Sequence, residues 1–206
     1  MVSFSDREIK ELVESVLDRF YGQDKTLNKE TSIEASHNPS PDNYKIITEH
    51  NSKTKQKIIA IGADHGGYEL KESIKKYLSE KGYIIADCGT HSKESVDYPD
   101  FAHAVALLVS ENKSWRGIVI DGAGIGSCMT ANKVPGVRAA MCYDHATAIN
   151  SREHNDANVL TLGAGLIGDN LAKQIVSTWL DTMFGGGRHA FRVEKIQAIE
   201  KLYLKE

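Results

Sequence analysis

The sequence lacks the features of a membrane or secreted protein. None of its apolar runs approaches the about 20 residues that a membrane-spanning helix needs. Its N-terminus shows no basic-then-apolar signal pattern. It has three cysteines, Cys88, Cys128 and Cys142, too few and too odd in number for a disulfide framework. We expect a cytoplasmic protein whose cysteines are small buried residues. Cys128 lies near a predicted helix start, which lowers a thiol pKa, so a nucleophilic role is the alternative for this cysteine.

A strong charge of either sign is also missing. The 206 residues carry a formal net charge of −3, which gives no indication of nucleic acid or of an anionic membrane as a partner. The eight histidines show no HExxH or similar metal-ligand spacing. We therefore expect a globular protein without a metal ion or cofactor.

Residues 1–22 contain a self-contained helix signal. Ser5 and Glu8 form a capping box. An apolar stripe at helical spacing follows it: Ile9, Leu12, Val13, Val16, Leu17 and Phe20. Residues 23–56 are instead polar and aperiodic, which predicts a flexible linker between this amphipathic helix and a domain over 57–206.

The amphipathic helix has two interpretations. Its apolar stripe packs back on the domain or on a neighbouring copy, or it lies in a groove of a separate protein. In the second case residues 4–22 resemble the encapsulation peptides that carry enzymes into bacterial microcompartments, and a shell protein is the expected partner.

From residue 57 short apolar runs alternate with amphipathic helices. Strands are expected at 58–62, 83–86, 117–120, 137–142 and 159–162. Helices are expected at 68–81, 99–111, 127–133, 144–152, 166–183 and 191–203. This alternation predicts an α/β fold with a parallel sheet that is covered on both faces.

The stretch from Ile118 to Gly126 reads as a buried strand that ends in Asp121 and runs into a glycine-rich loop. Glycines allow close approach to a ligand, and a helix that follows offers free N–H groups. This arrangement favours a phosphate or sugar-phosphate site, although a plain tight turn is the alternative. A partly desolvated Asp121 is suited to be a general base. Its alternative role is to accept hydrogen bonds from the loop.

Other polar residues lie at predicted strand ends. Asp64 and His65 follow the first strand, where a capped helix is the simpler explanation. His154 and Asn155 precede the fifth strand, so they must reach a site from a helix end or from another subunit. Arg188 and Arg192 are four residues apart and suit a phosphate, or form a solvated helix face.

The order and spacing of several motifs resemble the ribose-5-phosphate isomerase B / galactose-6-phosphate isomerase family. These are GADHGGYELK, DYPDFA, GAGIG followed by TANK, GVRAA, SREHNDANVL and GGRHAFRVEKI. The resemblance implies a Rossmann-like, three-layer αβα sandwich with a five-stranded parallel sheet. It also implies a homodimer or tetramer whose active sites are shared between subunits.

The resemblance implies an aldose–ketose isomerase that acts through an enediol, most simply on ribose 5-phosphate and ribulose 5-phosphate. His154 matches the ring-opening histidine. Substrate contacts match Asp64, His65, Asn155, Arg188, Arg192 and the loop residues Gly122, Ala123, Gly124, Ile125 and Gly126.

Three departures from the family pattern concern the expected site. Asp121 stands where one branch has a cysteine base, and Ser127 stands where another branch has a glutamate. Ala123 replaces a hydroxyl residue, and Gly165 replaces a phosphate-binding arginine. We expect Asp121 to act as the base. The alternatives are an enzyme of the same fold with another sugar or sugar acid, and a sugar-phosphate-binding protein without catalysis.

Overall fold

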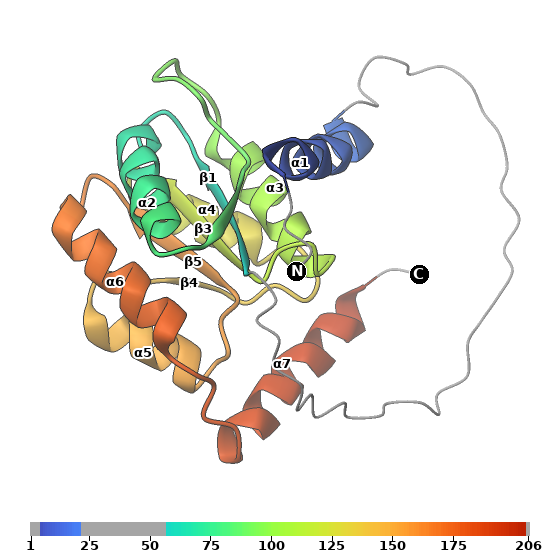
Figure 1. The fold of residues 1–206 in the computed structure, drawn as a ribbon. Helices are drawn as coiled ribbons and strands as arrows, with labels where there is room; N and C mark the ends of the chain where they lie inside the picture. The colour runs from blue at the N-terminus through green and yellow to red at the C-terminus, as the bar shows by residue number, and fades with distance from the viewer. Residues whose placement is uncertain (1–4, 22–56, 205–206) are drawn as a thin grey trace, which may run out of the picture.

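The computed structural model describes residues 5–21 and 57–204. The predicted linker over 23–56 lies outside these residues. Within them, the chain forms a five-stranded sheet with helices on both sides (Figure 1).

All strand pairs of the sheet are parallel, and the order is β2-β1-β3-β5-β4. The strands are β1 (Ile58–Ala63), β2 (Ile84–Asp87), β3 (Arg116–Asp121), β4 (Ala139–Met141) and β5 (Val159–Gly163). The chain leaves β1 toward β2 and returns on the other side of β1 as β3. In open parallel sheets, ligands bind beyond the carboxyl ends of the strands where the order reverses. The topology therefore points to the carboxyl ends of β1 and β3.

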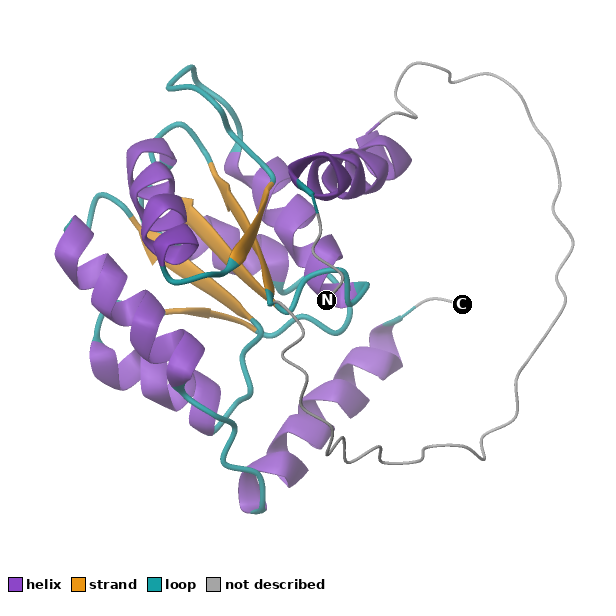
Figure 2. Cartoon of the chain, in the orientation of Figure 1, coloured by secondary structure: helices purple, strands orange, loops and turns teal. Residues whose placement is uncertain are grey.

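Helices cover both faces of the sheet, as Figure 2 shows. One face packs on α2 (Tyr68–Glu80), α5 (His145–Glu153) and α6 (Asp169–Asp181). The other packs on α3 (Tyr98–Ser110) and α4 (Ile125–Ala131), and α1 (Asp6–Tyr21) contacts α3 and the edge strand β2. The side chains of β1 alternate between the two cores: Ile58 and Ala60 face one, and Ile59 and Ile61 face the other. Because both faces of the strand are buried, its apolar run is continuous. The predicted Rossmann-like three-layer sandwich is confirmed.

Some predicted boundaries differ from those of the structure. The strand expected over 137–142 is confined to Ala139–Met141, because the Val137 N–H donates to Val134 O in a turn. The last helix, α7 (Arg188–Tyr203), begins three residues earlier than predicted. The His189 N–H already donates to Gly186 O, so the first helical turn uses the end of the glycine triplet. Turn hydrogen bonds of this kind leave no trace in the hydrophobic pattern.

Helix α1 forms over nearly the predicted range, and its capping box is present. The Ser5 N–H donates to Glu8 Oε2 at 2.6 Å, and the Glu8 N–H donates to Ser5 Oγ at 3.3 Å. Ile9 and Val13 are buried against the core that contains α3, and each such burial contributes about 1.5–3 kcal/mol. In the structure, the part of the apolar stripe formed by Ile9 and Val13 is thus covered by the chain's own domain.

Helix α7 extends beyond the three layers (Figure 1). Its buried side chains are His189 and Val193. Large apolar side chains are exposed along it: Phe191, Ile196, Ile199, Leu202 and Tyr203. An exposed apolar surface of this kind marks an interaction site.

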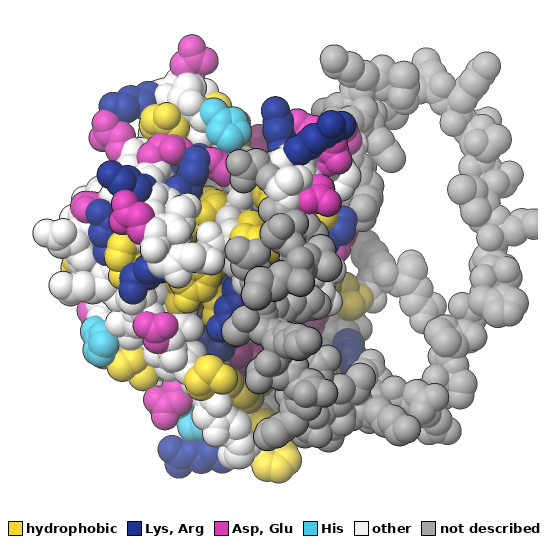
Figure 3. Space-filling model, viewed as in Figure 1, with side chains coloured by type: hydrophobic (Ala, Val, Ile, Leu, Met, Phe, Trp, Pro, Cys, Tyr) yellow, Lys and Arg dark blue, Asp and Glu magenta, His cyan; other side chains and the backbone are white. Residues whose placement is uncertain are grey.

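The surface in Figure 3 carries side chains of both charge signs. Lys and Arg side chains are interspersed with Asp and Glu, and they form no large area of one sign on this face. This agrees with the small net charge of the sequence. Among the described helices, none is long and apolar enough to cross a membrane.

Candidate functional site

Two carboxylates lie side by side at the carboxyl ends of β1 and β3. Ala63 pairs with Ile120, so the next residues, Asp64 and Asp121, leave neighbouring strands at the same level. The Asp64 N–H donates to Ile120 O at 3.3 Å, and both side chains are buried. The structure therefore brings these two predicted site residues together at the topological switch point.

The loop after β1 lies tightly against β3. A Cβ on Gly67 would lie 2.1 Å from Ile120 O, so a side chain cannot be accommodated there without a backbone shift. The Gly67 N–H donates to Asp64 Oδ1 at 2.9 Å, which fixes the carboxylate at the start of α2. His65, the next predicted site residue, is exposed, and its Nδ1 lies 3.2 Å from Val96 O. Asp64 thus holds the turn before α2 but does not cap the helix, because the N-cap residue is Gly67 and no side chain caps α2.

The glycine-rich loop after β3 is held between its neighbours. Gly124 has a φ of +79°, and Gly126 lies so close to Tyr98 that a Cβ would be 2.5 Å from the ring. Beside Gly122, no described atom lies within 4 Å of a built Cβ. The loop backbone therefore borders open space at Gly122.

Asp121 accepts hydrogen bonds from this loop with both oxygens. Oδ1 accepts from the N–H groups of Ala123 and Gly124, the first at 2.8 Å. Oδ2 accepts from the Ser127 N–H at 3.0 Å and from the Ser127 hydroxyl at 2.5 Å. These bonds correspond to the alternative role of Asp121, an acceptor for the loop. Two of the predicted substrate-contact residues, Ala123 and Gly124, point their N–H groups at this carboxylate.

The segment after β5 closes the same edge. The Ala164 N–H donates to Asp121 O at 2.8 Å, and the Gly165 N–H donates to Gly122 O at 2.9 Å. A Cβ on Gly165 would lie 3.0 Å from Gly122 O. The departure from the family pattern at Gly165 is therefore next to the loop itself.

The remaining predicted residues form a second group. The rings of His154 and His189 stack with centroids 4.1 Å apart. Burial lowers the pKa of His189, and the neighbouring His154, Arg188 and Arg192 lower it further. His189 Nδ1 is buried and lacks a hydrogen-bond partner within residues 5–21 and 57–204. The lowered pKa favours a neutral imidazole at His189. His189 was not among the site residues predicted from the sequence.

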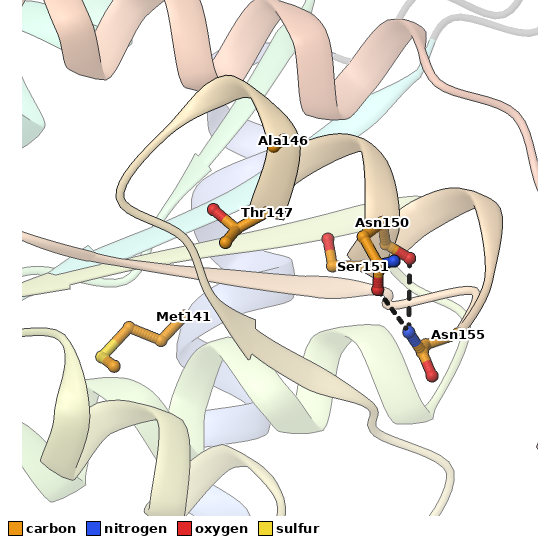
Figure 4. A pocket seen from close by; sticks show the side chains of 6 residues that line it. All are labelled: Met141, Ala146, Thr147, Asn150, Ser151 and Asn155. Carbon is orange, nitrogen blue, oxygen red and sulfur yellow. Dashed lines mark hydrogen bonds between the residues drawn. The ribbon is translucent and has the colours of Figure 1, made fainter.

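Asn155 lines a hollow of 450 Å³ on the surface of α5 and β4 (Figure 4). Its Nδ2 donates to Asn150 O at 3.2 Å, and Asn150 Nδ2 lies 2.8 Å from His154 Nδ1. Asn150 therefore orients both predicted residues. The sequence contained a signal for this contact, because Asn150 and His154 are four residues apart on one helix.

The two groups lie at opposite ends of the strands, the group of Asp121 at the carboxyl ends and the group of His154 at the amino ends. Asp121 pairs with Gly163 and Gly117 pairs with Val159, which places about 13 Å of strand between the two levels. His154 precedes Val159, and the Gly117 N–H donates to Asn158 O at 3.0 Å. One chain therefore does not unite Asp121 with His154.

The cysteines do not supply an activated thiol. Cys88 and Cys142 are buried, and Cys128 is half-buried. Burial raises the pKa of all three thiols. In the described part of the chain, no group of three His, Cys, Asp or Glu side chains is placed to hold a metal ion.

A model of the ribose/galactose isomerase family matches residues 59–196. The chain belongs to this family. It is 47% identical over 145 residues to ribose-5-phosphate isomerase B of Escherichia coli, covering 70% of this chain and 97% of that protein. It is 46% identical over 139 residues to D-erythrulose-4-phosphate isomerase of Pectobacterium atrosepticum, covering 67% and 91%.

A solved structure of the family gives the same result. Ribose-5-phosphate isomerase B of Clostridium thermocellum is 55% identical, with a TM-score of 0.71, and the match covers 71% of this chain and 99% of that one. The predicted class, an aldose–ketose isomerase of the ribose-5-phosphate isomerase type, is thereby confirmed. The family match begins after the predicted linker, so α1 lies outside it.

Proposed function

We propose that this isomerase interconverts ribose 5-phosphate and ribulose 5-phosphate. The observation that carries the proposal is the carboxylate pair at the switch point, in a chain closely similar to ribose-5-phosphate isomerases B. Asp121 removes the proton from the carbon beside the carbonyl, and the electrons move to the carbonyl oxygen to form the enediolate. The hydroxyl proton passes from the oxygen that becomes the new carbonyl to the former carbonyl oxygen, and Asp121 returns its proton to the former carbonyl carbon.

The other predicted residues complete the site. His154 opens the sugar ring, Arg188 and Arg192 bind the phosphate, and Asn155 contacts the sugar. Asp64, His65 and the loop from Gly122 through Ala123, Gly124 and Ile125 to Gly126 surround the reacting carbons. No metal ion or organic cofactor takes part in this proposal.

Because Asp121 and His154 lie at opposite ends of the strands, we propose that one subunit supplies Asp121 and that its partner supplies His154. A homodimer is the smallest assembly that does this, and a tetramer contains two of them. The exposed apolar side chains of α7 suit such an interface, since Arg188 and Arg192 stand on the same helix.

The test is turnover of ribose 5-phosphate by the wild type beside Asp121→Asn. Turnover by the wild type, with a loss of several orders of magnitude in kcat/KM for the variant, supports Asp121 as base. Equal turnover in both proteins moves the base elsewhere, and Cys128 is then the next residue to substitute.

A different sugar phosphate is the second candidate. Its support is the similarity to D-erythrulose-4-phosphate isomerase together with the departures at Ala123 and Gly165 beside the loop. A panel of tetrose, pentose and hexose phosphates, compared by kcat/KM, separates the two substrates. Tight binding of a sugar phosphate without turnover of any substrate would instead support a binding protein.

We further propose a cytoplasmic location, with the interior of a bacterial microcompartment as the alternative. In that alternative α1 leaves its own domain and docks on a shell protein. Deletion of residues 1–50 then leaves the activity intact and abolishes co-localisation with the shell. If the deletion collapses the enzyme, α1 is a structural part of the domain.

A further inference from the structure

The four hydrogen bonds to Asp121 are of two kinds. Three come from backbone N–H groups, those of Ala123, Gly124 and Ser127, which the fold of the loop fixes in place. The fourth comes from the Ser127 hydroxyl at 2.5 Å. A hydroxyl rotates about its C–O bond, whereas a backbone N–H moves only with the chain. The Ser127 hydroxyl is therefore the donor that can leave without rearrangement of the loop.

The position of Ser127 makes this bond strong. Its side chain is fully buried, and Asp121 is 5% exposed, so water does not compete for the hydroxyl. A hydrogen bond from a hydroxyl to a carboxylate in such surroundings is short and strong. Ser127 lies in the first turn of α4, where the Cys128 N–H donates to Gly124 O at 3.2 Å and ties the helix to the loop.

A carboxylate with all four acceptor positions filled is a poor base. If Asp121 takes a proton from the substrate, one of these positions must first be vacated. Other titratable groups also surround the loop on its neighbouring elements. These are Asp64 and His65 after β1, Tyr98 on α3, Cys128 on α4, and Tyr143 after β4, whose hydroxyl donates to Ala123 O at 3.2 Å.

We infer that Ser127 is a positioning residue for Asp121. Its hydroxyl holds the carboxylate turned into the loop, and rotation of the hydroxyl vacates the Oδ2 position that receives the proton. The second step rests on the proposed function, whereas the first does not. Loss of the hydroxyl removes a hydrogen bond that favours the ionised form of a carboxylate over its protonated form.

The first experiment measures the protonation of Asp121 directly. The ¹³C resonance of its side-chain carboxyl, assigned by its loss in Asp121→Asn, is followed from acid to neutral pH in three proteins. These are the wild type, Ser127→Ala and Thr130→Ala. Thr130 is the matched control, because its hydroxyl lies on the same helix but donates to Gly126 O at 3.0 Å.

We expect the midpoint of the titration to move to higher pH in Ser127→Ala and to stay unchanged in Thr130→Ala. The same midpoint in Ser127→Ala and in the wild type overturns the inference. This readout needs no turnover. If the wild type converts none of the sugar phosphates, the proposed function fails, and the midpoint still decides whether Ser127 controls Asp121.

The second experiment is the pH profile of kcat/KM in the same three proteins. We expect the acidic limb to move to higher pH in Ser127→Ala, and Ser127→Thr to restore its position. In the background of Asp121→Asn, the substitution of Ser127 should have no further effect. If the acidic limb of Ser127→Ala coincides with that of the wild type while the titration midpoint of its Asp121 carboxyl differs, the catalytic part of the inference is overturned.

Discussion

At the scale of single residues, a buried ion pair stabilises the carboxyl end of β1, which precedes Asp64. Lys71 is fully buried, and its Nζ donates to Asp87 Oδ1 at 2.8 Å. The loop after Asp87 then pairs with β1, because the Ala63 N–H donates to Gly89 O at 2.7 Å. The ion pair thus fixes the strand end that precedes Asp64.

Asp87→Asn is expected to lower the free energy of unfolding by about 2 kcal/mol at pH 7, because the buried Lys71 ammonium then keeps only Glu72, at 3.0 Å, as a charged partner. Burial alone would raise the pKa of Asp87. Hydrogen bonds from Lys71, Lys75 and the Gly89 N–H outweigh burial and lower it. The contribution of the ionised carboxylate is therefore present above about pH 4 and is lost as the pH falls through the lowered pKa.

Urea unfolding between pH 3 and 7 checks this prediction. The difference between wild type and variant should shrink toward pH 3. The control is Glu69→Gln, since Glu69 pairs with Lys93 on the surface, where solvent screens the pair, and the stability of this variant should stay near the wild-type value. A constant difference at every pH would contradict the assigned role of Asp87.

Gly67→Ala is expected to destabilise the protein by about 2 kcal/mol or more. The added Cβ would lie 2.1 Å from Ile120 O, and the backbone of the β1 loop must shift to relieve the contact. Thermal unfolding measures the effect. Gly168→Ala is the control, because no described atom lies within 4 Å of its built Cβ, and its midpoint should remain near the wild-type value. Similar midpoints for both variants would show that the loop yields to the side chain.

At the scale of elements, α1 has one apolar stripe, and the chain's own domain buries Ile9 and Val13 on it. Ile9 and Val13 are buried, and the exposed residues described on α1 are polar or charged, such as Arg7, Lys10 and Glu14. A partner that binds the apolar stripe must therefore displace α1 from the core that contains α3. Docking on another protein and packing on the domain exclude each other.

Val13→Asp should release α1 from the domain, because a carboxylate replaces a buried apolar side chain at a cost of about 2 kcal/mol or more. Hydrogen exchange of the α1 amides is the measurement, and their protection should fall to that of an isolated helix. Glu14→Gln, one residue further on the exposed side, should keep the wild-type protection. Unchanged protection in Val13→Asp would mean that the contact contributes little to holding α1.

At the scale of the whole molecule, the separation of Asp121 from His154 makes subunit mixing informative. Asp121→Asn and His154→Ala should each be nearly inactive alone. A mixed dimer of the two variants has one site with both residues intact and one with neither. Equal mixing should therefore restore about a quarter of the wild-type activity, since about half of the dimers are mixed and each has one intact site.

The mixture is unfolded and refolded together, and turnover of ribose 5-phosphate is compared with that of the separate variants. Separate refolding followed by brief mixing is the control, because subunits then remain with their own kind. Failure of joint refolding to restore activity, with mixed dimers verified by mass, would contradict the shared site.

The sequence by itself determined the elements and the family. Alternation of apolar runs with amphipathic stripes predicted all five strands and the helices, because burial on a sheet or a helix face imposes a period that local sequence records. The placement of Asp64 and Asp121 at strand ends followed from the same pattern. The capping box at Ser5 and Glu8 was likewise local, since three residues separate its partners.

Only the tertiary structure decided which of these residues meet. The sheet order places β1 beside β3, so Asp64 and Asp121 become neighbours, while the register of β3 with β5 holds His154 at the opposite end of the strands. The hydroxyl that binds Asp121 and the face that covers α1 were equally invisible in the sequence. The physical reason is that these contacts depend on strand order, register and loop closure between distant segments, which no local periodicity encodes.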